Sequence, residues 1–190
     1  KRAGEAGLRA LRSRWPTAHR IAVVCGGGNN GGDGYVIARF ARAAGLTVTV
    51  LAAVPAESLR GDAQRAAEEF QASGGQVHPF TAAALQQCEV IVDALLGIGA
   101  KGTLRPEVIA IVEAINAAGR PVFAVDIPSG LCADSGMPLG AAVRADHQRI
   151  GVVNTEFRAE QRLEDLNQRL IAVGQFHHQQ IALRDRQFGQ

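Results

Sequence analysis

A segment dense in glycine and small polar residues offers the first chemistry in this chain. Residues 25–34 read CGGGNNGGDG; they follow a short apolar run at 21–25 and precede a helical pattern of apolar residues that starts at Val36. Glycines at a strand-to-helix turn permit positive φ and let the backbone approach a ligand closely, and free amides at a helix start favour an anion. The segment therefore predicts a nucleotide-binding turn.

Two common nucleotide motifs fit this turn poorly. Residues 26–31 match G-x-G-x-x-G, but the next apolar run, at 47–53, holds no acidic residue for a ribose, and the first carboxylate after it is Glu57. Gly32 stands where a P-loop needs its lysine. Generic dinucleotide dehydrogenases and nucleoside triphosphatases are therefore both disfavoured.

The polar residues of the turn need a reason of their own. Asn29, Asn30 and Asp33 could cap the following helix, because short polar side chains bond to the free amides at helix starts. They could also contact a ligand. Taken alone, the turn leaves both interpretations open.

Two aspartates lie in or at the end of later apolar runs. Asp93 falls within the run at 90–96, and Asp126 falls near the end of the run at 121–127. A carboxylate in an apolar strand costs free energy unless it is paired or bound, so both are candidate site residues. A second glycine-rich segment, at 97–103, directly follows the first of these runs.

A parallel sheet would bring these residues together. Apolar runs predict strands at 21–25, 47–53, 76–80, 90–96 and 121–127, and helical patterns predict helices after the glycine turn and at 62–72, 82–88 and 106–118. Alternating strands and helices predict an α/β fold with a parallel sheet covered on both faces. In such sheets ligands bind beyond the carboxyl ends of the strands, where the loops of this chain can converge.

Composition fits a single folded domain. The chain has 190 residues, 47% of them hydrophobic, and a net charge of +2, so it can bury a full core and offers little to nucleic acid. It contains no apolar run long enough to span a membrane and no leader-like segment, so we expect a soluble, cytoplasmic protein without membrane partners. Three cysteines without paired spacing indicate neither disulfides nor a zinc site.

The last part of the chain has a different character. Residues 1–146 contain 19 glycines and 5 glutamines, whereas residues 147–190 contain 3 glycines and 8 glutamines and lack the strand–helix alternation. We therefore expect an atypical tail at 147–190, either disordered or forming one amphipathic helix.

Three segments together resemble one protein family. GGGNNGGDGYVIARF, VDALLGIGAKG and AVDIPSGLCADSG occur in this order and are similar to the NAD(P)HX epimerases, the YjeF N-terminal domains of bacterial bifunctional NAD(P)H-hydrate repair enzymes. The resemblance covers roughly residues 1–146 and implies a Rossmann-like three-layer αβα sandwich with a mostly parallel sheet. It implies an isomerase that interconverts the R and S forms of hydrated NADH and NADPH (NADHX and NADPHX) in nicotinamide-nucleotide repair.

The resemblance also assigns roles to individual positions. It implies a potassium ion bound by oxygens of Asn30, Asp93 and Ser129, as a hard cation prefers. Asp126 matches a substrate-contacting aspartate and is the candidate catalytic acid/base, because inverting the carbon that bears the hydroxyl moves a proton. The other implied substrate contacts are Asn29, Asn30, Gly31, Gly32 and Asp33, with Gly97, Ile98, Gly99, Ala100, Lys101, Gly102 and Thr103 cradling the phosphates.

The chain also departs from the family pattern. Its start, KRAGEA, resembles the first family helix without the segment before it, so we expect an N-terminally incomplete domain. The pattern is lost abruptly after Asp146, as a frameshift or fusion would produce, and we expect no dehydratase domain in this chain. A homodimer is implied by the resemblance alone. Two alternatives stay open: a noncatalytic Rossmann-like binding or scaffold module, and an inactive truncated copy of the epimerase.

Overall fold

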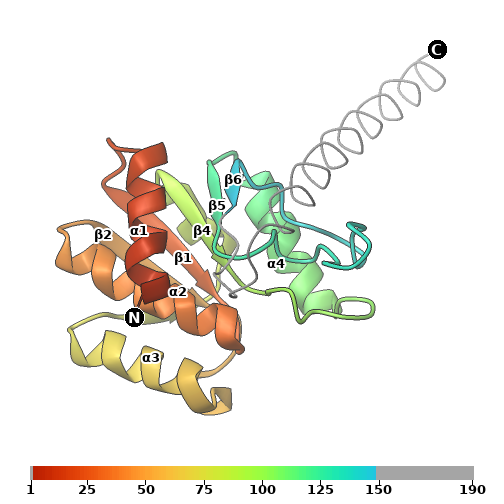
Figure 1. Ribbon diagram of the computed structural model, residues 1–190, viewed down its shortest axis with the longest axis horizontal. Helices are drawn as coiled ribbons and strands as arrows, with labels where there is room; N and C mark the ends of the chain where they lie inside the picture. The colour runs from red at the N-terminus through yellow and green to blue at the C-terminus, as the bar shows by residue number, and fades with distance from the viewer. Residues whose placement is uncertain (1, 149–190) are drawn as a thin grey trace. The chain divides into compact units, whose positions relative to one another are not determined.

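The computed structural model describes residues 2–148, and Figure 1 shows their helices and strands. The prediction for the tail from residue 149 onward lies outside the described residues. The elements are α1 (Arg2–Arg14), β1 (Arg20–Cys25), α2 (Asn29–Ala43), β2 (Thr47–Ala52), the 3₁₀ turn η1 (Ala56–Ser58), α3 (Gly61–Ala72), β3 (Val77–Pro79), the 3₁₀ helix η2 (Ala82–Gln87), β4 (Val90–Ala94), α4 (Pro106–Ala117), β5 (Val122–Ala124) and β6 (His147–Gln148).

The strands of residues 2–148 form one parallel sheet in the order β3-β2-β1-β4-β5-β6. Cys25 of β1 is paired with Ala52 of β2 on one side and with Ala94 of β4 on the other. Asp93 of β4 is paired with Ala124 of β5. The carboxyl ends of the four central strands therefore lie along one edge, as the sequence pattern predicts.

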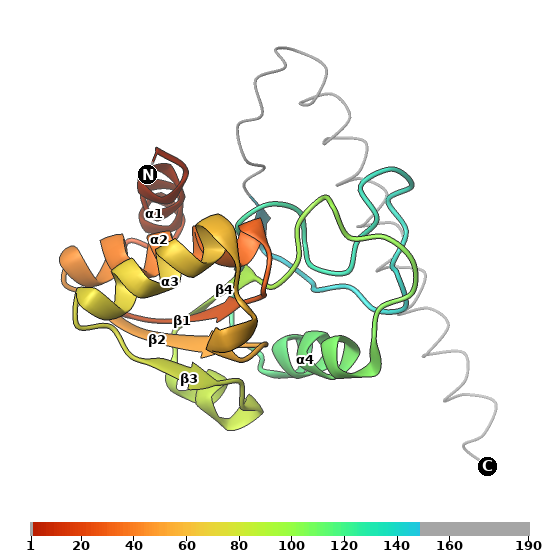
Figure 2. The ribbon, with the colours of Figure 1, turned by 90° about the horizontal axis from the view of Figure 1, so that it is seen from below.

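Alternate residues of each strand face two separate cores, because successive side chains of a strand point to opposite faces. In β1, Ile21 and Val23 pack with α1, α2 and α3, whereas Ala22 and Val24 pack with η2 and α4. Figure 2 shows α2 and α3 on one side of the strands and α4 on the other. The prediction of an α/β sandwich is confirmed.

Most of the glycine-rich segment is helix, which corrects the prediction of a turn over residues 25–34. Because α2 begins at Asn29, only residues 26–28 connect it to β1. No glycine between 26 and 34 has a positive φ. The N-cap residue is Gly28, which makes no side-chain capping hydrogen bond, so Asn29 and Asn30 lie in the first turn of the helix and not at its N-cap.

These glycines instead allow close packing. A Cβ atom at Gly31 would overlap the carbonyl oxygen of Gly26, and one at Gly34 would lie 2.5 Å from Cβ of Ala94. Real Cβ contacts are never this short, so only glycine lets α2 lie so near the turn and β4. The helix gains this proximity in spite of the unfavourable helix propensity of glycine.

Other element boundaries differ modestly from expectation. The segment expected to form a helix at 82–88 is the 3₁₀ helix η2. The strand β1 begins one residue earlier than predicted, at Arg20, and the other four predicted strands are shorter than predicted. Among residues 2–148, no helix is long and apolar enough to cross the hydrocarbon layer of a membrane.

The short strand β6 was not predicted, because the sequence pattern ends at Asp146. The Asp146 carboxylate accepts a hydrogen bond from the Val122 N–H (2.8 Å), and the backbone N–H of Asp146 donates to the Val122 carbonyl (2.9 Å). The imidazole of His147 then stacks on the ring of Phe123 at 5.8 Å between centroids. These contacts hold the chain beside β5 for two more residues.

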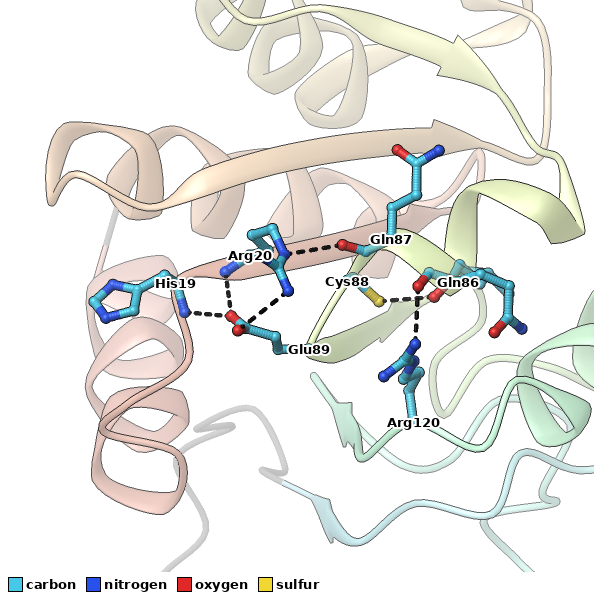
Figure 3. A network of polar contacts seen from close by, with 8 residues as sticks. His19, Arg20, Gln86, Gln87, Cys88, Glu89 and Arg120 are labelled. Carbon is cyan, nitrogen blue, oxygen red and sulfur yellow. Dashed lines mark hydrogen bonds and ion pairs between the residues drawn. The ribbon is translucent and has the colours of Figure 1, made fainter.

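At the amino-terminal edge of the sheet, Glu89 joins β1 to the segment before β4 (Figure 3). Its carboxylate accepts hydrogen bonds from the backbone N–H groups of His19 (2.7 Å) and Arg20 (2.8 Å) and lies 3.4 Å from the Arg20 guanidinium. The Arg20 side chain also donates to the Gln87 carbonyl (3.1 Å). The backbone donors lower the pKa of Glu89 below its ordinary value.

We expect Glu89→Gln to reduce stability at neutral pH and to weaken the dependence of stability on acid. Because the folded-state pKa of Glu89 is lowered, its charge stabilises the fold above the ordinary value of 4.5. That contribution disappears as the pH falls through the lowered pKa. Thermal unfolding of both proteins at a series of pH values between neutral and strongly acidic measures the difference.

The matched control is Glu113→Gln on the exposed surface of α4, which should leave the pH profile unchanged. The melting temperatures of wild type and Glu89→Gln should converge in acid. Parallel profiles at all pH values would contradict the assigned role of Glu89.

Candidate functional site

Three of the expected site residues meet at the carboxyl edge of the sheet. Asn30 lies in the first turn of α2, Asp93 lies in β4, and Ser129 lies in the loop after β5. Each makes a hydrogen bond to the backbone of the segment after β4 or to another member of the group. We call Asn30, Asp93, Leu96 and Ser129 the Asp93 cluster.

Asp93 is a fully buried carboxylate whose oxygens are satisfied within the protein. Its Oδ1 accepts hydrogen bonds from Ser129 Oγ (2.5 Å) and the Leu95 N–H (3.2 Å), and its Oδ2 accepts one from the Ser129 N–H (2.8 Å). Burial raises the pKa of Asp93, and the hydrogen bonds oppose this rise. The carboxylate therefore ties the end of β4 to the loop after β5.

The backbone of Leu96 connects Ser129 to Asn30. The Leu96 N–H donates to Ser129 Oγ (2.8 Å), and the Leu96 carbonyl accepts from Asn30 Nδ2 (2.7 Å). Ser129 Oγ also lies 3.2 Å from that carbonyl, but its single proton has the shorter contact with Asp93. These bonds join α2, the segment after β4 and the loop after β5 at Leu96. The sequence did not predict this role of Leu96, because backbone hydrogen bonds do not depend on residue type.

Asp126 lies two residues after β5 and is half-buried, so solvent and ligands can reach its carboxylate. Its Oδ2 accepts a hydrogen bond from the Ile98 N–H at 2.9 Å. A Cβ at Gly97 would lie 2.8 Å from this oxygen, so a larger residue at position 97 would displace the carboxylate. Ile98 itself is 51% exposed, which leaves an apolar side chain uncovered beside Asp126.

The loop at 97–103 is braced by a second loop. The Ala100 N–H donates to the Gly97 carbonyl (3.1 Å), forming a tight turn, and the Leu104 N–H donates to the Leu139 carbonyl (2.9 Å). Lys101 is exposed, and Cβ atoms at Gly99 and Gly102 would meet only open space. The loop therefore has room for a ligand, and its assignment to phosphates stays a prediction.

The residues predicted at 29–33 to contact the substrate lie in different environments. Asn29 is exposed at the start of α2, and Asn30 belongs to the Asp93 cluster. Gly31 and Gly32 are buried, and a Cβ at Gly32 would lie 3.1 Å from Cα of Ala63 in α3. Asp33 is half-buried on the same helix. The structure thus brings Asn30 to the site and places Gly31 and Gly32 in packing contacts.

The donor chemistry of the Asp93 cluster suits a hard cation. Residues 2–148 contain no group of three or more histidine, cysteine, aspartate or glutamate side chains arranged to hold a metal. The cluster instead combines one carboxylate with amide, hydroxyl and carbonyl oxygens. Such neutral oxygens favour a weakly charged, hard ion over zinc or copper.

A protein-family profile matches most of the chain. The family described as "YjeF-related protein N-terminus" matches residues 1–148. The bifunctional NAD(P)H-hydrate repair enzyme Nnr of Coxiella burnetii is 49% identical over 145 residues, which cover 76% of this chain and 30% of the relative. This chain therefore spans less than a third of the length of that bifunctional relative.

Two further comparisons concern a shorter relative and the fold. The NAD(P)H-hydrate epimerase of Rhodopirellula baltica is 40% identical over 131 residues, covering 67% of this chain and 54% of the relative. The crystal structure of yeast YNL200c superposes with a TM-score of 0.69 at 24% identity, covering 77% of this chain and 66% of that chain. The structural match supports the fold alone.

We expect Ser129→Ala to destabilise the protein by about 2 kcal/mol, because it leaves a half-buried N–H and a buried carboxylate oxygen short of a partner. The affected groups are the Leu96 N–H and Asp93 Oδ1. Urea unfolding, followed by circular dichroism, measures the change in free energy.

Ser73→Ala is the matched control. Ser73 Oγ also donates a hydrogen bond, to the Phe70 carbonyl at 2.6 Å, but Ser73 is exposed. Its loss should cost less than about 0.5 kcal/mol. Equal effects of the two substitutions would show that the Asp93 cluster does not hold the site together.

Proposed function

The chain belongs to the family of YjeF-related protein N-termini, and from that premise we propose that it is an NAD(P)H-hydrate epimerase domain. The observation that carries the proposal is the reachable Asp126 carboxylate, held by the Ile98 N–H beside the Asp93 cluster. Two relatives bear names that include NAD(P)H-hydrate repair or epimerisation. The proposed substrates are accordingly the R and S forms of hydrated NADH and NADPH.

Asp126 is proposed to move the proton that epimerisation requires. In one route, its carboxyl group protonates the hydroxyl of the substrate, the C–O bond breaks as the ring nitrogen lone pair forms a C=N bond, and water leaves. Water then adds to the opposite face and returns a proton to the carboxylate. One group thus acts first as acid and then as base.

In the second route the ring opens at nitrogen. The Asp126 carboxylate takes the hydroxyl proton while the oxygen lone pair forms a carbonyl, the C–N bond breaks, and the nitrogen takes up a proton. Closure of the nitrogen onto the other face of the carbonyl reverses these transfers. Both routes need a single carboxyl group that can reach the substrate.

The surrounding backbone is proposed to orient the reaction. The Ile98 N–H fixes one oxygen of Asp126 and leaves the other available to the substrate. The 97–103 loop offers backbone amides and the exposed Lys101 to the phosphates. The exposed Ile98 side chain offers an apolar surface to one side of the hydrated ring.

Potassium fits the donor set at this site. Oxygens of Asn30, Asp93 and Ser129 would hold the ion, which would supply positive charge beside the substrate phosphates when bound. The buried Asp93 supports this proposal, because a nearby cation would offset the cost of burying its charge. The residues around it anchor the loops whether or not the ion is present.

We expect Asp126→Asn to slow epimerisation by about 10²- to 10⁴-fold while leaving substrate binding largely intact, because the amide cannot exchange the proton. The assay starts from the purified R form of hydrated NADH and follows the appearance of the S form by chromatography. Asp134→Asn is the control, since Asp134 is an exposed carboxylate in the loop after Ser129. An Asp126→Asn protein as active as wild type would overturn the proposed role.

We expect epimerisation to be faster in potassium than in sodium at equal ionic strength, and Asn30→Ala to weaken this preference. Asn116→Ala is the matched control, because the Asn116 side chain also donates to a backbone carbonyl, that of Ala142 (3.0 Å), and in addition accepts a hydrogen bond from the Arg144 N–H (2.8 Å). Rates are measured over a potassium titration. Identical rates in both salts would contradict a potassium site.

A further inference from the structure

A pocket of about 780 Å³ lies between the first turns of α4 and the carboxyl ends of β2 and β3. We call it the α4 pocket and use the lining residues Val54, His78, Phe80, Glu107, Ala110 and Ala114. Its volume falls in the range of small-molecule sites. None of the site residues predicted from the sequence lines it.

The pocket exists because the crossover between β3 and β4 is short. The chain makes only the 3₁₀ helix η2 between these strands, whereas a parallel crossover usually includes a full helix that covers the sheet. Phe80 and Ala53 pack only partly against the core on this face. The ends of β2 and β3 are therefore left open toward α4.

The α4 pocket is connected to Asp126 along the carboxyl edge. Val54 lies beside Gly27 of the glycine turn, since a Cβ at Gly27 would be 3.2 Å from Val54 Cγ2. The turn continues this edge, because the Gly26 N–H donates to the Ala94 carbonyl (3.0 Å) and the Val125 N–H donates to the Asp93 carbonyl (3.0 Å).

The order of the strands gives the distance between the α4 pocket and Asp126. From β2 to β5 there are three intervals between neighbouring strands, or about 14 Å. Rossmann-type sheets bind extended dinucleotides across the carboxyl ends of several strands in this way. One half of a dinucleotide can therefore lie at Asp126 while the other reaches the α4 pocket.

The chemistry of the pocket suits an adenine ring. Val54, Phe80 and Ala110 offer apolar and aromatic surface for the faces of the ring. The exposed Glu107 carboxylate, at the N-terminal turn of α4, can accept a hydrogen bond from the exocyclic amine. The hydrated nicotinamide ring is not the expected occupant of this pocket, because its reacting carbon must lie at Asp126.

We propose that the α4 pocket binds the adenosine half of the hydrated dinucleotide, an inference that rests on the proposed function. The nicotinamide half lies at Asp126, the phosphates lie between the glycine turn and the 97–103 loop, and the adenine enters the space between α4 and Phe80. Adenosine binding in this pocket increases affinity and leaves the chemical step unchanged.

The test compares two substrates, hydrated NADH and the hydrate of reduced nicotinamide mononucleotide, which lacks the adenosine half. Ala110→Trp fills the pocket from an exposed helix position. We expect it to raise KM for hydrated NADH about tenfold or more at unchanged kcat, and to leave kcat/KM for the mononucleotide hydrate unchanged. An unchanged KM for hydrated NADH, or equal losses with both substrates, would overturn the inference.

Two variants separate binding from folding. Ala117→Trp places the same side chain on an exposed position of α4 outside the pocket lining and should change neither substrate. Glu107→Lys alters only the exposed rim and should raise KM for hydrated NADH alone. A Glu107→Lys protein with wild-type KM would contradict recognition of the adenine amine.

A failure of the proposed function would look different. Wild-type protein would then epimerise neither substrate, whereas failure of the inference alone leaves wild-type activity intact. In that case AMP binding, measured by calorimetry, tests the pocket directly. Saturable AMP binding that is lost in Ala110→Trp and kept in Ala117→Trp supports the adenosine site, and absence of AMP binding overturns it.

Discussion

The buried carboxylate of Asp93 is the constraint on which this site depends. An ionised group without water is costly, so the fold must supply hydrogen bonds, and Ser129 supplies two of them. Those bonds fix the loop after β5 against the end of β4. Leu96 then takes its position from Ser129, and the chain passes directly to Gly97 and Ile98, which hold Asp126. One buried charge therefore determines where the reachable carboxylate lies.

Close packing of glycines makes this edge compact enough for these bonds to form. Gly26 leaves no room for a Cβ beside the Leu95 carbonyl, and Gly34 leaves none beside Ala94. Larger residues would push α2 and the glycine turn away from β4, and Asn30 would lose its reach to the Leu96 carbonyl. The glycines thus act on the candidate site indirectly, by setting the distance between α2 and β4.

The fold was predictable because its signals are local. Apolar runs and helical spacing identified the sheet, and the polar exceptions in those runs, Asp93 and Asp126, pointed to its carboxyl edge. The start of α2 was predicted too late in the chain, because a run of glycines suggests a turn. The close tertiary contacts that require these glycines cannot be seen in the sequence. The roles of Leu96 and the Ile98 N–H were not predictable, since backbone groups carry no sequence signal. The α4 pocket lies where the crossover between β3 and β4 forms only the short 3₁₀ helix η2.

Exposure separates the roles of the two aspartates at neighbouring strand ends. Asp93 makes three hydrogen bonds inside the protein and has no contact with solvent, so a proton moved to or from it would have no route to a substrate. Asp126 keeps one oxygen fixed by Ile98 and stands where the edge opens. If the two environments were exchanged, the carboxylate at position 126 would be buried away from any substrate, and the one at position 93 would be too exposed to hold the loops together. The sequence carries the same residue type at both places, and it is the fold that makes Asp93 an anchor and leaves Asp126 open to solvent, as the proposed acid/base role requires.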